Sequence, residues 1–342
     1  MPSLKEIKGR INSISSTLAI TSAMKMVASA KLQKAQMAIQ NMLPYERRLH
    51  SMLLDLMGAV NMSAPASEEG SARLVSLSNQ PDHTESEGAY SLMAQREVRN
   101  VAIVAFASNS SLCGAFNSNV IREATAVINE YRASGLGDAD ITVYSVGRKM
   151  AEAMRKLGFP SPADFTKMSD SPSYDAASAL AQELFDGFVS GRFDKVELVY
   201  NHYKSTSSQP TTRQTYLPLS LADATADIQV GKITDSASEP YADKVAEPVV
   251  RQNSPTTETP DLIVEPSKEE LIATLLPKVV RLRVFTTLLD STAAEHAART
   301  VAMQLATDNG NDLLQELTLE YNKGRQQKIT SEILDLVGGS MQ

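Results

Sequence analysis

The C-terminal stretch from Lys268 to Val337 restricts the fold more than any other part of this sequence, because its helical patterning continues almost to the end of the chain. As a single α-helix rising about 1.5 Å per residue, it would be about 105 Å long. The interior of a globular domain of this chain's size is much shorter. We therefore expect a helix that leaves its domain and packs against a partner along its length.

Composition narrows the classes of function. The chain is 42% hydrophobic but only 5% aromatic, without tryptophan, which favours long helices over a deep mixed core. Its net charge of −7 argues against nucleic-acid binding, which requires a basic surface. The single cysteine, Cys113, excludes an internal disulfide and a cysteine-based metal site. No apolar run approaches the ~20 residues that span a bilayer, so we expect a soluble chain without direct membrane insertion.

The N-terminal segment, residues 1–60, also has helical patterning. Apolar residues recur at alternating steps of three and four, the spacing of a coiled-coil seam, at Leu4, Ile7, Ile11, Ile14 and Leu18. Pro44 is expected to kink or interrupt this helix. By itself the seam is also compatible with a core helix of a bundle. A second helix of matching reach at residues 266–342 favours an antiparallel two-helix coiled coil formed by the two ends of the chain.

The segment between these helices divides into three parts. Residues 61–97 are expected to be a flexible insertion and residues 221–265 a low-complexity insertion or connection, because both are rich in polar residues and proline. In residues 98–220, apolar strand-like runs alternate with helical patterns, which predicts a small Rossmann-like α/β domain with a mainly parallel sheet. The expected strands are 98–107, 141–146, 195–203 and an edge strand at 211–219, and the expected helices are 117–133, 148–157 and 174–190. The predicted fold class is thus α/β, with this domain inserted into the coiled coil.

The polar turn after the first strand, residues 108–117 (SNSSLCGAFN), is where an open α/β sheet usually binds its ligand. It has one glycine, Gly114, and matches neither the dinucleotide nor the phosphate-loop pattern. Cys113 is interpreted as a small buried residue rather than a nucleophile, since nothing nearby predicts a lowered thiol pKa. We predict no catalytic residue, cofactor or metal site. A nucleotide-dependent enzyme in this domain remains a less favoured alternative.

The final helix has two unusual features. Gly310 and Gly324 each cost about 1 kcal/mol relative to alanine inside a helix, which suggests the close approach of another chain. Apolar residues also surround the far end of the expected rod instead of following one face. They are Met24, Met26, Val27, Ile333, Leu336 and Val337. This pattern predicts a rod whose end is enclosed by a partner, whereas a static coiled-coil scaffold, the main alternative, would have a continuous seam and a polar end.

Four segments resemble the gamma subunit of F-type ATP synthases, in its bacterial form: residues 3–17 (SLKEIKGRINSISST), 20–36 (ITSAMKMVASAKLQKAQ), 110–117 (SSLCGAFN) and 297–339 (AARTVAMQ to LVGG). The resemblance implies a central-stalk rotor, itself non-catalytic and without a cofactor. Its partners would be a hexamer of alpha and beta subunits, the epsilon subunit and the membrane c ring. It would couple ion flow through that ring to ATP synthesis or hydrolysis, as a peripheral protein on the cytoplasmic side of the bacterial inner membrane.

The resemblance also assigns roles to individual residues. Arg325 and Gln326 match a pair that contacts a loop of one beta subunit. Met24 and Lys25 match a segment that faces the lever region of beta. Ile333, Leu336 and Val337 would form the tip that turns against the top of the hexamer. This chain departs from the family at Gly324, where alanine is common, and its second insertion lacks the cysteines of the chloroplast form.

Overall fold

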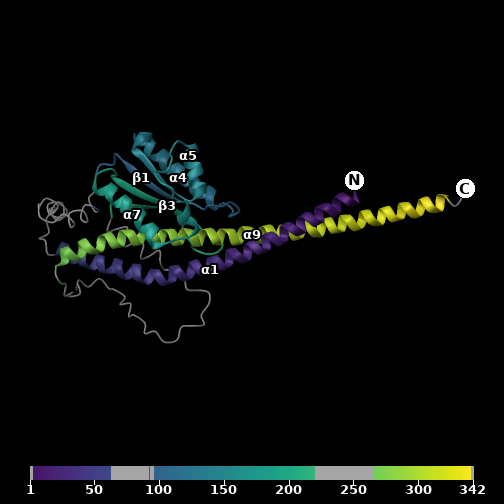
Figure 1. Ribbon diagram of the computed structural model, residues 1–342, viewed down its shortest axis with the longest axis horizontal. Coiled ribbons are helices and arrows are strands. Elements are labelled where there is room, and N and C mark those ends of the chain that lie inside the picture. The colour runs from purple at the N-terminus through teal and green to yellow at the C-terminus, as the bar shows by residue number, and fades with distance from the viewer. Residues whose placement is uncertain (1–2, 63–91, 93–95, 220–264, 266, 340–342) are drawn as a thin grey trace, which may run out of the picture.

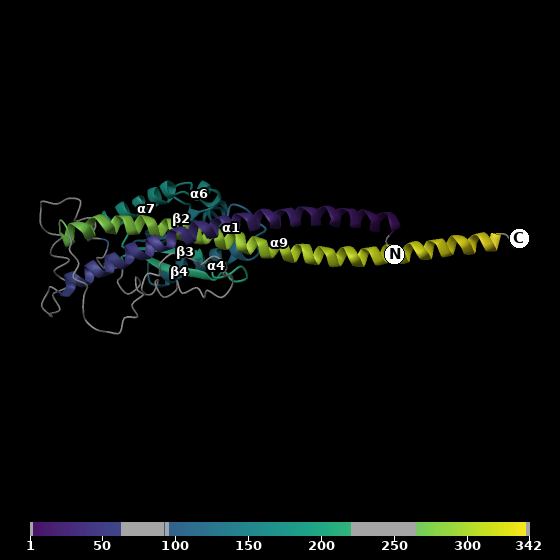
Figure 2. The same cartoon turned by 90° about the horizontal axis from the view of Figure 1, so that it is seen from below.

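The computed structural model describes residues 3–62, 92, 96–219, 265 and 267–339. Two long helices, α1 (Leu4–Met62) and α9 (Lys268–Gly339), lie side by side as a rod, and an α/β domain packs against one side of it (Figures 1 and 2). Both chain ends lie at the end of the rod away from the domain, and the C-terminus extends beyond the N-terminus (Figure 1). This arrangement confirms the predicted fold class. The expected insertions, 61–97 and 221–265, lie almost wholly outside the described residues.

Helix α1 continues through Pro44, so the expected interruption was wrong, while a kink at this residue stays a prediction. Proline removes one backbone donor and costs about 3 kcal/mol or more in a helix interior. Leucines and alanines of α1 are buried on both sides of this position, at Leu32, Ala35, Leu49 and Leu53. Because tertiary packing supplies most of the stability of a helix in a protein, this burial holds the helix together across the proline.

The sheet of the α/β domain has four strands in the order β2-β1-β3-β4. Their bounds are Val101–Phe106 for β1, Ile141–Val146 for β2, Lys195–Asn201 for β3 and Thr211–Leu217 for β4. The central strand β1 pairs in parallel with β2 and β3, and β4 is an antiparallel edge strand on β3. The mainly parallel sheet and its edge strand were therefore predicted correctly.

Helices cover both faces of this sheet. Helices α4 (Phe116–Ala133) and α5 (Arg148–Lys156) pack on one face, and α7 (Tyr174–Val189) packs on the other together with α9. Two short elements were not predicted, the 3₁₀ turn η2 (Asp138–Asp140) and helix α6 (Thr166–Asp170). Neither is long enough to repeat an apolar period. The rod thus serves as one of the covering layers of the domain.

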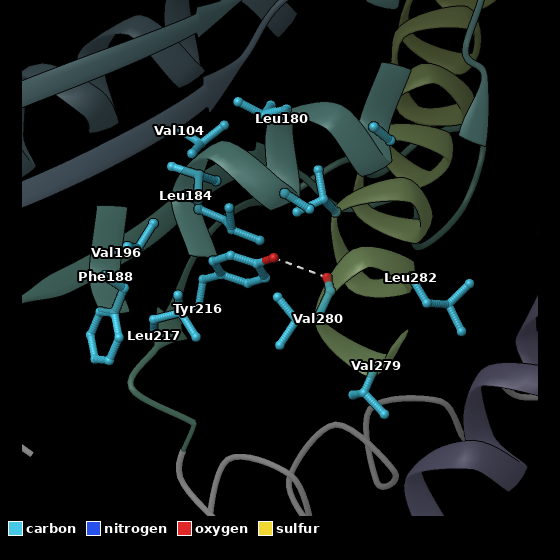
Figure 3. Packing of buried hydrophobic residues seen from close by; sticks show 14 of the residues in the cluster. Val104, Leu180, Leu184, Phe188, Val196, Tyr216, Leu217, Val279, Val280 and Leu282 are labelled. Carbon is cyan, nitrogen blue, oxygen red and sulfur yellow. Dashed lines mark hydrogen bonds between the residues drawn. The ribbon is translucent and has the colours of Figure 1, made fainter. Parts of the chain in front are cut away.

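Between the sheet and the rod lies an apolar cluster that is larger than the one on the opposite face of the sheet (Figure 3). Tyr216 of β4 lies among Leu184 and Phe188 of α7 and Val279 and Val280 of α9. Its hydroxyl donates a hydrogen bond of 2.9 Å to the carbonyl oxygen of Val280. Burial of this phenol raises its pKa well above the usual range, so it remains a donor at every physiological pH. The contact joins the edge strand directly to the backbone of the rod.

Beyond the domain, α1 and α9 form a continuous seam. Thr307 of α9 donates to Thr21 of α1 at 3.1 Å. A Cβ atom at Gly310 would lie 2.6 Å from Leu18 Cδ2, and one at Gly324 would lie 3.1 Å from Leu4 Cδ2. The two glycines therefore permit close packing of the N-terminal helix of the same chain. The expectation that they mark the approach of another chain was wrong.

Candidate partner-contact surface

The end of α9 extends past its partner helix. Leu4 begins α1, faces Gly324 and lines a groove with Gln327 and Lys328, so α1 ends beside the first turn after Gly324 and the rest of α9 continues alone (Figure 1). At about 1.5 Å per residue, residues 325–339 are about 22 Å long. We call residues 325–339 the free end of α9. An isolated helix of this length is marginally stable in water, so it favours a surrounding partner.

The free end exposes large apolar side chains. Their exposed fractions are 47% for Ile329, 54% for Ile333, 65% for Leu334 and 74% for Leu336. Helix α9 includes Val337, whose side chain lies outside the described part of the structure. Single exposed apolar residues are normal on a protein surface, but several within three turns indicate an interaction site. Ile333 and Leu336 are therefore exposed at the far end, as expected. Met24, Met26 and Val27 are not there, because Met24 and Val27 line a cavity with His296 and Arg299 near the α/β domain; the expectation that they surround this end was wrong.

Arg325 and Gln326 are both exposed at the start of the free end. Gly324, just before them, faces Leu4 and closes the seam. A groove of about 340 Å³ lies at this point, lined by residues of both helices that include Ile7 and Lys323. Residues 322–328 of α9 (NKGRQQK) carry no large apolar side chain, and they lie where α1 ends. Arg325 and Gln326 are exposed and do not line this groove, so they are accessible to a partner.

Met24 and Lys25 lie elsewhere on the rod, and both are half-buried. Thr21 pairs with Thr307, so this part of α1 is about 27 Å along α9 from Arg325 at ~1.5 Å per residue. Met24 lines a cavity with residues of α9 and of the loop after β1. The structure therefore does not bring the two expected beta-contact pairs together; they are two separate places on one rod.

Hydrogen bonds from its own side chains stabilise the loop after β1. Asn117 Oδ1 accepts the backbone N–H of Ser108 at 3.0 Å, and its Nδ2 donates to the Ser110 carbonyl at 3.1 Å. Asn109 Oδ1 accepts the backbone N–H of Arg148 at 2.7 Å, which satisfies a free donor at the start of α5. Cys113 is buried, as predicted. The Ser108 N–H, the Ser110 carbonyl and the two asparagine amides are thus engaged in bonds that hold the loop.

The same loop attaches the domain to the rod. Arg299 Nη2 of α9 donates to Ser110 Oγ at 2.7 Å. Cys113 and Phe116 form a small apolar cluster with Ala294 of α9, and a Cβ at Gly114 would lie 3.9 Å from Ala302. Gly114 has a φ of +58°, which glycine adopts without strain. The SSLCGAFN motif is therefore a docking element between the two parts of the molecule.

A second attachment, which the sequence did not reveal, follows strand β3. His202 Nδ1 lies 2.6 Å from Asp290 Oδ2 of α9, and Asp290 Oδ1 accepts the backbone N–H of Tyr203 at 2.9 Å. Gln36 of α1 donates to the Tyr203 hydroxyl at 2.6 Å. The bond to the Asp290 carboxylate raises the pKa of His202. The only available signal was the position of Asp290 in an otherwise apolar and small-residue section of α9.

Among the described residues, no cluster of three or more histidine, cysteine or acidic side chains could hold a metal ion. None of the helices described is long and apolar enough to cross a membrane.

Comparisons with known proteins support one family. Residues 3–341 match the family described as ATP synthase. The chain is similar to the ATP synthase gamma chains of Phocaeicola vulgatus and Bacteroides thetaiotaomicron, at 49% and 47% identity over the full length of both chains. Its fold is similar to that of a chain in the Euglena gracilis mitochondrial ATP synthase OSCP/F1/c-ring assembly. That match has a TM-score of 0.54 at 18% identity and covers 99% of this chain and 93% of the other.

These matches extend over the rod, the docking loop and the free end of α9 together. They confirm the resemblance to bacterial sequences found in the four motifs. The chain belongs to the ATP synthase gamma-chain family, whose members are the non-catalytic central-stalk subunit of the F-type complex.

Proposed function

We propose that this chain is the rotating shaft that couples ion flow through a membrane c ring to ATP synthesis or hydrolysis in the catalytic beta subunits. The observation that carries the proposal is the free end of α9, which exposes Ile333 and Leu336 where α1 no longer covers the helix. A static scaffold would have a polar end. An enclosing hexamer of alpha and beta subunits would bury this apolar surface.

The proposed mechanism follows from the shape of the rod. Two helices side by side, then one helix alone, have no three-fold symmetry. A shaft of this form makes different contacts with each of three identical beta subunits, and so shifts each conformational equilibrium differently. Rotation would then carry each subunit through the same sequence of nucleotide affinities. No covalent bond is made or broken by this chain.

The remaining partners are proposed from the family and from the two-part architecture. The α/β domain and the adjacent end of the rod would sit on the c ring, beside the epsilon subunit. The chain would be peripheral to the cytoplasmic face of a bacterial inner membrane, held there by these subunits. The similar Euglena chain is part of an assembly with F1 and a c-ring, which is consistent with this placement.

Individual residues have proposed contacts. Arg325 and Gln326 would hydrogen-bond a loop of one beta subunit, which their exposure permits. Met24 and Lys25 would face the lever region of beta from their separate place on the rod. Ile333, Leu336 and Val337 would form the apolar bearing at the top of the hexamer. Because the bearing contacts are non-directional, they would guide the shaft without fixing one angle.

The test replaces Arg325 by alanine in the assembled complex and measures ATP-driven ion pumping and ATP hydrolysis in vesicles. A lost charge-assisted hydrogen bond is worth about 1.5–3 kcal/mol, which corresponds to at least about a tenfold loss of coupled turnover. Lys328→Ala is the matched control, since Lys328 is also an exposed cation of α9, three residues further along, and pairs with Glu332 of the same helix at 3.8 Å.

Unchanged pumping in Arg325→Ala would refute the proposed beta contact. Failure of the chain to co-purify with alpha and beta subunits would refute the rotor itself.

A further inference from the structure

A cavity of about 280 Å³ lies where α1, α9 and the loop after β1 meet. Its apolar part comes from α1 and includes Met24 and Val27. Its polar part consists of Lys31 of α1, Ser110 of the loop, and His296 and Arg299 of α9. Among these polar groups there is no carboxylate. Three segments that are distant in the sequence thus present hydrogen-bond donors to one space.

Arg299 is fixed by two contacts that leave some of its N–H groups available to a ligand. Its Nη2 donates to Ser110 Oγ at 2.7 Å and pairs with Glu295 Oε1 at 2.9 Å. Both contacts use the same nitrogen, which leaves the other guanidinium N–H groups for a further acceptor. Because Ser110 Oγ accepts from Arg299, its own hydroxyl proton can be donated as well. Glu295 pairs with Arg299 and Asp170 lies near Glu295 outside the cavity lining, whereas Lys31 lines the cavity and supplies a second positive charge to it.

His296 provides the independent sign that a ligand is missing. Its side chain is only 9% exposed, and its Nδ1 has no hydrogen-bond partner in the described part of the chain. A buried polar group without a partner costs about 1–3 kcal/mol, so such groups are rare in native proteins. Burial, with Arg299 and Lys31 nearby, lowers the pKa of His296 to about 4. The ring is therefore neutral at pH 7, and in the Nδ1–H tautomer its unpartnered nitrogen can donate to an anion in the cavity.

We propose that this cavity binds a small oxyanion of the phosphate or carboxylate class, held by Lys31, Arg299, Ser110 and His296. Charge-assisted bonds to an ionised oxygen are about twice as strong as neutral ones, and all four groups supply donors. The occupant is a small anion rather than an acidic side chain of another subunit, because it must reach a nitrogen that is nine-tenths buried. The proposal does not depend on rotation or on the proposed beta contacts.

A bound oxyanion would have a structural consequence. It would bridge α1, α9 and the SSLCGAFN loop at once, and so tighten the attachment of the α/β domain to the rod. Because only the folded chain assembles these donors, the anion would raise the stability of the chain as its concentration exceeds the dissociation constant.

The experiment uses the isolated full-length chain with isotope-labelled histidine, since this chain has four histidines and His296 can be assigned by loss of its signal in His296→Gln. Nuclear magnetic resonance follows the pKa of His296 as inorganic phosphate, acetate or chloride is added at constant ionic strength. An oxyanion in the cavity introduces an opposite charge beside the ring, so phosphate or acetate should raise this pKa by about one unit or more. Comparison of the two anions identifies the class.

Lys31→Gln is the test variant, because its exposed side chain is not needed for folding. It should weaken the apparent affinity about tenfold, the loss of one charge-assisted contact. Lys34→Gln is the matched control, an equally exposed lysine one turn along α1 that does not line the cavity, and it should leave the titration unchanged.

Three outcomes would overturn the proposal. One is a pKa of His296 that neither phosphate nor acetate moves. Another is an equal response to chloride, or in Lys31→Gln, which would mean general ionic screening. The third is a response to an acidic peptide without any response to the two small anions, which would make the cavity a protein-docking site instead.

Discussion

Replacement of Gly310 by alanine tests whether the seam between the two helices is packed as closely as the structure indicates. The new methyl carbon would lie 2.6 Å from Leu18 Cδ2 and 3.1 Å from Leu18 Cγ. Non-bonded carbon atoms prefer a separation of about 3.5–4.0 Å, so the methyl group is short of space by about 1 Å. Rotation of the leucine tip does not relieve the contact with Cγ. Either Leu18 leaves its rotamer or the helices separate.

Two effects of opposite sign then decide the stability. Alanine is favoured over glycine inside a helix by about 1 kcal/mol. Overpacking a close contact costs typically about 1–3 kcal/mol. We therefore expect Gly310→Ala to lower the free energy of unfolding by up to about 2 kcal/mol. Gly324→Ala is the matched control, because its methyl group would meet only the flexible tip of Leu4, at 3.1 Å, and we expect it to gain up to about 1 kcal/mol.

The assay is urea unfolding of the full chain followed by circular dichroism, with hydrogen exchange of α1 and α9 to locate the change. In a Leu18→Ala background the steric conflict is absent, so Gly310→Ala should become stabilising by about 1 kcal/mol, and the difference between backgrounds measures the contact. If Gly310→Ala stabilises the chain as much as Gly324→Ala does, the close packing of the seam is refuted.

Three further predictions concern the α/β domain and its attachment. Because Asp290 raises the pKa of His202, the stability from this pair should be fully present below the ordinary histidine pKa and lost as pH rises through the raised value. Melting temperatures across this range should therefore fall with pH in the native chain, and this component should vanish in Asp290→Asn. Glu197, buried at 1% exposure, binds Arg213, Lys195 and the Tyr131 hydroxyl, so Glu197→Gln should cost about 3 kcal/mol in urea unfolding; a cost near zero would contradict a charge-dependent network. Tyr216→Phe keeps the ring but removes the bond to Val280, so a loss of about 1 kcal/mol is expected, and a loss as large as that of a cavity mutant would mean that the ring itself has moved.

Local periodicity was sufficient to predict the main elements of the fold. Steps of three and four from Leu4 to Leu18 identified the seam, and the apolar run 98–107 identified the central strand. Their physical basis is short-range, since side-chain period follows directly from helix or strand geometry. Pro44 and Gly310 were misinterpreted because their effect depends on what packs against them. Leu18 became a neighbour of Gly310 only in the folded chain.

In the candidate site, too, the exposed residues were predicted from the sequence and the contacts between distant segments were not. Exposure of Arg325, Gln326, Ile333 and Leu336 agrees with the sequence interpretation, because none of the residues that the structure describes covers them. Their contacts with other subunits remain predictions. The ties that Asp290 makes with His202 and Arg299 makes with Ser110 could not be predicted, since each joins segments whose positions are set by the completed sheet. Charged residues in an alanine-rich helical stretch are the one sequence signal that indicates such ties.

The layout of the rod also determines the order in which the molecule can form during its synthesis. Thr21 and Thr307, hydrogen-bonded across the seam, are 286 positions apart in the sequence. All four strands lie between these residues, so the ribosome completes the sheet long before it delivers the helix that pairs with α1. Until then the leucines and isoleucines of α1 have no seam partner, a period in which exposed apolar surface invites aggregation. The nascent chain therefore depends on protection of its N-terminus until its final residues emerge.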